Sequence, residues 1–207
     1  MAQQVSLVYK NIFFYRCLMN LIYGGNYKQR FEKIIEIMER VNPKLVLELC
    51  FADTIIADYC KHKNITWEGY DLNENFVKRA MRLGYHAKCQ DILLATNFKK
   101  NDLCIISGSL YHFNADERLA LVKKILASTS QLLISEPIIN LSAQKGLMGY
   151  IARRSASIGK GNENFRYNEK SLKATLDELG QALNFKYTVV GFIKKDLLIL
   201  IDKNEIN

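Results

Sequence analysis

Short apolar runs alternate with longer amphipathic segments along most of this chain, and this alternation restricts the folds that it can adopt. The segment 27–40 places its apolar residues at helical spacing and predicts a helix that ends before Pro43. The apolar run LVLELC at 45–50 follows it and is typical of a strand covered on both faces. Strands that alternate with helices in this way predict an α/β fold with a mostly parallel sheet and helices on both faces.

The alternation continues to residue 135 and then changes. Further strands are expected at 66–71, 85–89, 102–107 and 131–135, and helices at 53–62, 73–83 and 115–129. Near the end of the chain, two apolar runs at 185–193 and 195–203 are separated only by a basic turn, which predicts an antiparallel hairpin. A parallel sheet that finishes on such a hairpin is a narrower class than a general Rossmann-like fold.

The chain is expected to form a single domain, 1–207, because it has only two prolines and no Gly/Ser-rich linker. Five cysteines are scattered without a C-x-x-C pair, which predicts buried free thiols in a reducing cytoplasm and no metal site. The net charge of +8 indicates solubility, or else an anionic substrate or membrane surface. The apolar stretch 11–23 is short and interrupted by Arg16, so neither a signal peptide nor a transmembrane span is expected.

Acidic residues stand at the ends of three predicted strands, where ligands of open parallel sheets bind. Glu48 ends the first strand, Asp71 ends the second, and Asp91 follows the third. Like charges at this edge would repel a phosphate, so the pattern favours a cationic or polyhydroxylated ligand. Asp71 lies at about the interval from Glu48 at which a carboxylate reaches the hydroxyls of a ribose. Alternatively, Asp71 belongs to the cap of the next helix.

These features together resemble the class I S-adenosylmethionine-dependent methyltransferases. The resemblance extends from Tyr27 onward and lies in the order VLELC, WEGYDLN, KCQDIL, DLCIISGSLYHF and the final hairpin. An uncharacterised bacterial branch of that superfamily is similar in SGSLYHF (107–113), SEPIINLS (135–142) and GKGNENFRYNEKSL (159–172). The resemblance implies a seven-stranded sheet that ends in an antiparallel strand, with S-adenosylmethionine as cofactor and S-adenosylhomocysteine as product.

The resemblance also assigns the cofactor-binding residues. Glu48 and its turn would hold the methionine end of the cofactor, Asp71 the ribose, and Asp91 with Ile92 the adenine. The full implied set is Glu48, Cys50, Ala52, Asp71, Leu72, Asp91, Ile92, Ser107 and Gly108.

The turn after Glu48 departs from the superfamily pattern. Cys50, Ala52 and Thr54 stand where Gly-x-Gly-x-Gly is usual, and glycine serves where φ is positive or where the backbone approaches a ligand closely. The cofactor has no pyrophosphate, and Cys and Ala are small, so binding of S-adenosylmethionine is expected and binding of NAD(P) is disfavoured. The alternative is a relic site that has lost its ligand.

Candidates for the chemistry follow the fourth and fifth strands. Tyr111 and His112 stand where the transferred methyl group would lie, and His112 is the best placed of the three histidines to remove a proton. Alternatively, His112 is a structural residue at the start of a helix. Glu136 is a second candidate, either to orient His112 or the acceptor, or to bond backbone amides in its turn.

Two segments are expected to cover the site. The first, 141–168, combines basic and aromatic residues and predicts a substrate cover for an anionic or glycosylated acceptor; the alternative is an exposed helix with solvated charges. The second, an N-terminal helical cap over 1–40, is expected to pack against the sheet. Alternatively, its aromatic-rich part, 13–27, closes over the cofactor or makes a peripheral contact with a membrane.

The predicted function is methyl transfer to a small-molecule or saccharide acceptor, through oxygen or nitrogen. The alternative is a non-catalytic methyltransferase-like module that binds a partner through its basic segment. Nucleic acid is not the expected partner, because the chain has no appended RNA-binding domain and no N/D-P-P-Y motif after the fourth strand.

Overall fold

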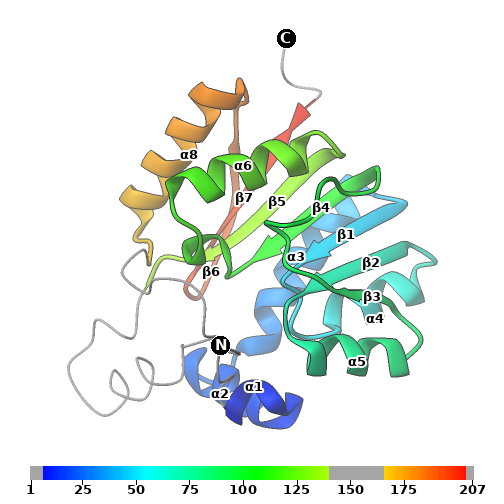
Figure 1. Cartoon of the computed structure of the whole chain (residues 1–207). Coiled ribbons are helices and arrows are strands. Elements are labelled where there is room, and N and C mark those ends of the chain that lie inside the picture. Colours follow the sequence, from blue (N-terminus) through cyan, green and yellow to red (C-terminus); the bar gives the residue numbers. More distant parts are fainter. Residues whose placement is uncertain (1–6, 140–165, 204–207) are drawn as a thin grey trace.

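The computed structural model describes residues 7–139 and 166–203, and these form one seven-stranded sheet in the order β3-β2-β1-β4-β5-β7-β6 (Figure 1). The strands are β1 Leu45–Leu49, β2 Thr66–Asp71, β3 His86–Cys89, β4 Asn101–Ser107, β5 Thr129–Pro137, β6 Thr188–Ile193 and β7 Asp196–Asp202. Strands β1 to β5 are parallel, whereas β7 runs antiparallel to both β5 and β6. The predicted fold class, with its C-terminal antiparallel hairpin, is confirmed.

Helices cover both faces of the sheet. They are α1 Leu7–Lys10, α2 Ile12–Ile22, α3 Tyr27–Val41, α4 Ile55–His62, α5 Glu74–Arg82, the short 3₁₀ helix η1 Leu110–His112, α6 Ala115–Leu126 and α8 Glu169–Leu183. Apolar residues of α2, α3, α4 and α5 pack in one core cluster, and those of α6 and α8 pack in a second one on the other face. The residues Leu103 to Ile106 of β4 are fully buried because both faces of that strand are covered.

Several boundaries differ from the predictions for local reasons. Helix α4 begins at Ile55 rather than residue 53, because Asp53 belongs to the loop after β1. Helix α6 ends at Leu126 rather than residue 129, because Thr129 already pairs with Asn101 in the sheet. Strand β6 begins at Thr188 instead of residue 185. Helix α8 was not predicted from the sequence, although a capping box at its start marks it.

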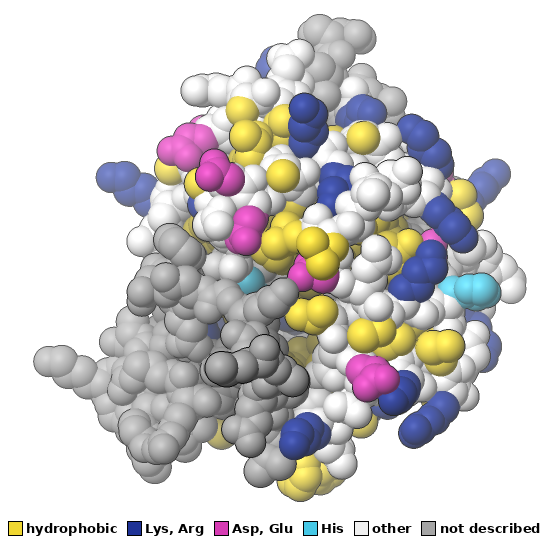
Figure 2. All heavy atoms as spheres, in the orientation of Figure 1, with side chains coloured by type: hydrophobic (Ala, Val, Ile, Leu, Met, Phe, Trp, Pro, Cys, Tyr) yellow, Lys and Arg dark blue, Asp and Glu magenta, His cyan; other side chains and the backbone are white. Residues whose placement is uncertain are grey.

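The surface carries the positive charge that the sequence indicates, since Lys and Arg side chains are spread over the face shown in Figure 2.

All five cysteines are free. Cys60 and Cys104 are buried, whereas Cys17 and Cys89 are exposed, so the prediction of buried thiols is wrong for these two. Cys17 lies on the outer side of α2, and Cys89 ends β3 at the edge of the sheet. Within residues 7–139 and 166–203, no helix combines the length and the apolar character needed to cross a membrane.

Candidate functional site

The loop between β1 and α4 adopts a glycine-like turn without glycine. Cys50 has φ of +56° and Ala52 has φ of +48°, both in the left-handed region that non-glycine residues rarely occupy. Two backbone amides fix the turn against β2: the Cys50 amide donates to the Tyr70 carbonyl at 2.7 Å, and the Ala52 amide donates to Asp71 Oδ2 at 3.0 Å. The loop therefore keeps the backbone shape that a glycine-rich turn would have, at the cost of local strain.

This strain gives a testable prediction. Replacing Ala52 by glycine should raise the free energy of unfolding by roughly 0.5–1 kcal/mol, because the left-handed conformation costs a non-glycine residue about 1–2 kcal/mol and the more flexible unfolded chain offsets part of the gain. Urea unfolding measures the change. The matched control is Ala120→Gly in the exposed part of α6, which should lower the same quantity by about 0.8–1 kcal/mol. A loss of stability in both variants would contradict a strained turn.

Glu48 is buried beneath this loop. Its carboxyl is 1% exposed and accepts a hydrogen bond from Trp67 Nε1 at 2.9 Å. The Trp67 ring lies over Gly69, where any Cβ would stand only 2.1 Å from the indole, and it packs edge-on against Phe51 of the loop. Burial raises the pKa of Glu48 to about 8, and the nearby Asp53 and Asp71 add to the rise. The structure thus places Glu48 as a support under the turn.

Asp71 is held at the end of β2 by backbone amides. One carboxylate oxygen accepts from Ala52 and the other from Asn73, at 3.0 and 2.7 Å. Burial raises the pKa of Asp71 to about 6, although these bonds to the charged form oppose the rise. The helix cap itself is Asn73, whose side chain accepts from the Asn75 amide at 3.0 Å. Asp71 therefore ties the loop after β1 to the loop after β2.

Cys50 lies where the predicted residues converge. Burial raises the pKa of its thiol, and the carboxylates of Asp71, Glu136 and Asp91 are close enough to contribute, while Ser109 forms a hydrogen bond with it. Because β3, β2, β1, β4 and β5 are parallel neighbours, their carboxyl ends lie at one edge of the sheet. This is the arrangement that the strand-end pattern predicts.

The other predicted cofactor residues occupy different surroundings at this edge. Asp91 Oδ1 accepts from the Leu93 amide at 3.0 Å, and Ile92 is 4% exposed in the core, so its side chain packs inward. Leu72 is 52% exposed beside Asp71. The Ser107 hydroxyl is buried and has no hydrogen-bond partner among the described residues. Gly108 has φ of +60°, and a Cβ there would lie 2.7 Å from the guanidinium of a buried arginine, Arg30.

The turn after β4 carries the predicted catalytic residues. Glu136 is fully buried, and its Oε1 accepts from the amides of Ser109 and Leu110 at 2.8 and 2.6 Å. Burial raises the pKa of Glu136 to about 7. The structure thus has Glu136 bonding backbone amides, and through them it holds the short helix η1 that ends at His112.

His112 is only partly buried and lies against Tyr111, with 4.0 Å between the two ring centroids. Burial and the nearby Arg166 lower the pKa of His112 from 6.5 to about 4. The imidazole is therefore neutral throughout the physiological range. In contrast, the side chains of His62 and His86 are exposed to solvent.

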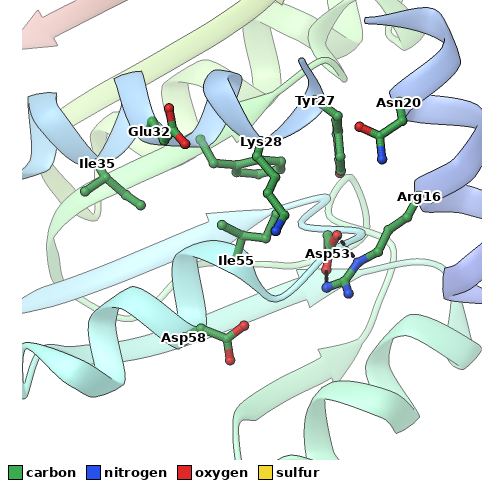
Figure 3. Close-up of a pocket in the computed structure, with 10 residues that line it drawn as sticks. Arg16, Asn20, Tyr27, Lys28, Glu32, Ile35, Asp53, Ile55 and Asp58 are labelled. Atoms are coloured by element: carbon green, nitrogen blue, oxygen red, sulfur yellow. Dashed lines mark hydrogen bonds and ion pairs between the residues drawn. The ribbon is translucent and has the colours of Figure 1, made fainter. Parts of the chain in front are cut away.

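An ion pair that the sequence did not predict fixes the outer side of the loop after β1. Asp53 is fully buried, and Arg16 of α2 donates two hydrogen bonds to it, from Nε to Oδ2 at 2.8 Å and from Nη2 to Oδ1 at 2.6 Å (Figure 3). The Thr54 amide also donates to Asp53 at 2.8 Å. The visible signal in the sequence is that Arg16 is the single charged residue of an otherwise uncharged helix. Such a residue predicts a partner carboxylate.

The same pair lines a groove of about 320 Å³ between α2, α3 and α4 (Figure 3). Tyr27 and Phe31 form apolar walls, and Lys28 and Glu32 lie on α3 beside them. As the structure describes it, the groove includes none of the residues predicted to bind the cofactor. It therefore marks the outer side of the loop rather than the predicted cofactor edge.

A second unpredicted ion pair is buried next to Gly108. Arg30 of α3 pairs with Asp196 at the start of β7, and both side chains are almost entirely buried. Asp196 also accepts hydrogen bonds from the Tyr23 hydroxyl at 2.8 Å and from Ser135 Oγ at 3.0 Å. Lys195, next along the chain, donates to the Ile22 carbonyl at 2.6 Å. The C-terminal hairpin is thus connected to the N-terminal helices at the same edge of the sheet.

No protein-family model and no curated protein sequence matches the chain. Solved structures do resemble it over most of its length. The plantazolicin methyltransferase BamL, in complex with a triazolic desmethylPZN analog and SAH, is 14% identical with a TM-score of 0.66, and the match covers 90% of each chain. An S-adenosylmethionine-dependent methyltransferase from Clostridium acetobutylicum is 14% identical with a TM-score of 0.64 and covers 92% of this chain and 97% of that one.

A third structure, the methyltransferase domain of bacterial CtHen1-CN, is 14% identical with a TM-score of 0.62. The match covers 84% of this chain and 98% of that domain. At these identities the likeness concerns the fold, and it agrees with the sheet order and the antiparallel hairpin described above.

Proposed function

Because this chain has the fold of the class I S-adenosylmethionine-dependent methyltransferases, we propose that it transfers a methyl group from S-adenosylmethionine to a small-molecule or saccharide acceptor, at an oxygen or a nitrogen atom. The observation that carries the proposal is the convergence of Asp71, Asp91 and the strained turn at Cys50 on one edge of the sheet. A ligand with a sulfonium cation and a ribose suits such an acidic edge. A phosphate does not, because its negative charge would be repelled there.

The residues at this edge fit the cofactor. A carboxylate has about four acceptor positions, and the amides of Ala52, Asn73 and Leu72 take only part of that capacity at Asp71, so the hydroxyls of a ribose can share the rest. Leu72 offers an exposed apolar surface next to it, and Ser107 offers a buried hydroxyl that has no partner among the described residues. When bound, the cofactor supplies the electrophilic methyl group.

The chain's own contribution to the chemistry would be alignment and proton removal. Holding the acceptor in line with the donor can by itself contribute about 7–11 kcal/mol. The imidazole of His112 is neutral, so it can take the proton of an acceptor hydroxyl, and Tyr111 packs against it. Glu136 is fully buried and is proposed to act as a positioning residue, because its carboxylate fixes the amides of the turn that carries His112.

Two arginines near this turn support the proposal that the acceptor carries an anionic group. Arg166 lies 5.3 Å from the ring centroid of Tyr111, and Arg118 lies 5.8 Å from that of Tyr167. We propose 1–207 as one domain in which 1–40 is a helical cap and 141–168 is the substrate cover. Most of that cover, residues 141–165, lies outside the described residues.

Calorimetric titration with S-adenosylmethionine and, separately, with S-adenosylhomocysteine tests the proposal. Binding of both ligands in the micromolar range is expected. If neither ligand produces heat or a shift in melting temperature, the cofactor site is a relic. In that case the alternative function, a non-catalytic module that binds a partner through its basic segment, replaces the proposal.

The proposed role of His112 predicts the pH profile of the transfer. Because the pKa of His112 is lowered to about 4, its basic form persists well below the usual histidine range. Asp71 and Glu136 titrate at higher pH, so the contribution of His112 is taken as the ratio of the wild-type rate to that of His112→Gln. With a hydroxyl acceptor, this ratio should stay constant between about pH 8 and pH 5 and fall only toward pH 4. A ratio that falls near pH 6.5 instead would contradict a lowered pKa of His112. His62→Gln is the matched control, because His62 is exposed and its loss should leave the profile unchanged.

A further inference from the structure

The outward side of helix α2 is apolar although it faces solvent. Phe13 is 65% exposed, Phe14 57% and Leu21 48%, and Cys17 is exposed between them. We call these four residues the α2 outer face. The opposite side of the helix packs on the core through Tyr15 and its neighbours. At the lower end of the molecule, where Figure 1 places α1 and α2, hydrophobic side chains reach the surface in Figure 2.

An exposed helix face made of large apolar side chains is normally covered, either by protein or by lipid. Helix α5 shows the usual pattern for a surface helix of this chain, since its outward residues include Glu74, Lys78 and Arg82. Helix α2 has no acidic residue, and its one charged residue, Arg16, is turned toward Asp53. The α2 outer face is therefore built for contact with something apolar.

The charge around this face points to an anionic partner. The sequence has no Asp or Glu before Glu32. Of the four cations in this stretch, Arg16 and Arg30 are paired with Asp53 and Asp196, which leaves the charges of Lys10 and Lys28. Lys10 and Lys28 are exposed at the end of α1 and the start of α3. Two nearby carboxylates are already neutralised by ion pairs: Asp53 with Arg16, and Glu74 with Lys78 at 2.7 Å.

We propose that α1 and α2 dock this protein on an anionic lipid surface, with the α2 outer face in the boundary between headgroups and acyl chains. The 11 residues of α2 span about 16 Å, which is too short to cross a bilayer but suits a helix that lies in its plane. A second copy of the chain is a poorer occupant, because α1 and α2 have no acidic side chain that could pair with Lys10 of the other copy across a two-fold contact. The proposal is independent of the methyl-transfer proposal.

Docking would place the membrane beside the candidate site. The Asn73 side chain donates to the Tyr9 carbonyl of α1 at 2.7 Å, next to Asp71, and Arg16 of α2 holds the loop after β1. A lipid-linked or membrane-associated acceptor would then reach the carboxyl edge of the sheet without leaving the surface.

Flotation of the purified full chain with vesicles tests this inference. Vesicles of phosphatidylcholine with phosphatidylglycerol should carry the protein upward, and vesicles of phosphatidylcholine alone should carry far less. The double variant Phe13→Ser, Phe14→Ser should bind the anionic vesicles roughly tenfold more weakly or worse. Lys10→Gln should weaken binding by roughly fivefold, and added salt should weaken the binding of the wild type.

The matched control is Met81→Ser, which removes an apolar side chain that is 59% exposed on α5. It should bind the vesicles like the wild type. Because Phe13 and Phe14 are exposed, the double variant should also keep the wild-type melting temperature. Equal binding of the double variant and the wild type would overturn the proposal. So would a dimer in sedimentation that the double variant abolishes, because the α2 outer face would then be a contact between copies.

Discussion

Replacing Asp71 by alanine is expected to weaken the binding of S-adenosylmethionine by about a hundredfold or more, because two hydrogen bonds to a charged acceptor are worth about 1.5–3 kcal/mol each. The structure adds a second reason for a large effect. Asp71 accepts the Ala52 amide and thereby fixes the strained turn after β1, so the variant loses both the proposed ribose contact and the shape of the turn. Calorimetric titration of the variant measures the loss.

Asp102 provides a matched control for this experiment. Asp102 lies on β4, and its Oδ2 accepts hydrogen bonds from the amides of Lys44 and Leu45 at 2.8 and 2.9 Å. It therefore also holds a neighbouring strand through backbone amides, but at the amino-terminal end of β1. Asp102→Ala should lose comparable stability and still bind the cofactor as the wild type does. If Asp71→Ala binds normally, Asp71 is only a structural carboxylate and the ribose contact must be made elsewhere.

Replacing Asp196 by alanine is expected to lower the free energy of unfolding by about 3–5 kcal/mol, because it leaves the buried guanidinium of Arg30 without its partner. Asp196 also accepts hydrogen bonds from Tyr23 and Ser135, and these donors lose their acceptor too. For a domain of this size, such a loss corresponds to a fall in melting temperature of about 10 °C. Urea unfolding and calorimetry of the purified variant measure both quantities.

The double variant Arg30→Met, Asp196→Leu separates the buried charge from the rest of the effect. Replacing both charges by apolar side chains removes the uncompensated guanidinium, so the double variant should be more stable than Asp196→Ala alone. An exposed ion pair serves as the control: Glu169→Ala breaks the pair with Lys173 in α8 and should cost less than about 1 kcal/mol. A double variant less stable than the single one would show that hydrogen bonds, and not the ion pair, dominate at this position.

Much of the fold could be predicted because its signals are local. The apolar run at 45–50 predicts a strand and the amphipathic segment at 27–40 predicts a helix, and both are found. The strand predicted at 66–71 has the observed bounds. The rule that ligands bind at the carboxyl ends of parallel strands then points from the sequence alone to Glu48, Asp71 and Asp91. Helix α8 is not among the predicted elements, because it follows the long segment 141–168, which was interpreted only as a substrate cover.

What the sequence alone determined is therefore the alternation of elements, the antiparallel hairpin and the acidic strand ends, since each depends on periodicity and order along the chain. Only the tertiary structure decided which charges are paired. Arg16 meets Asp53, and Arg30 meets Asp196, across separations that no local pattern encodes. It also decided the protonation of His112, because an imidazole's pKa depends on how deeply packing buries it and on which cation lies beside it.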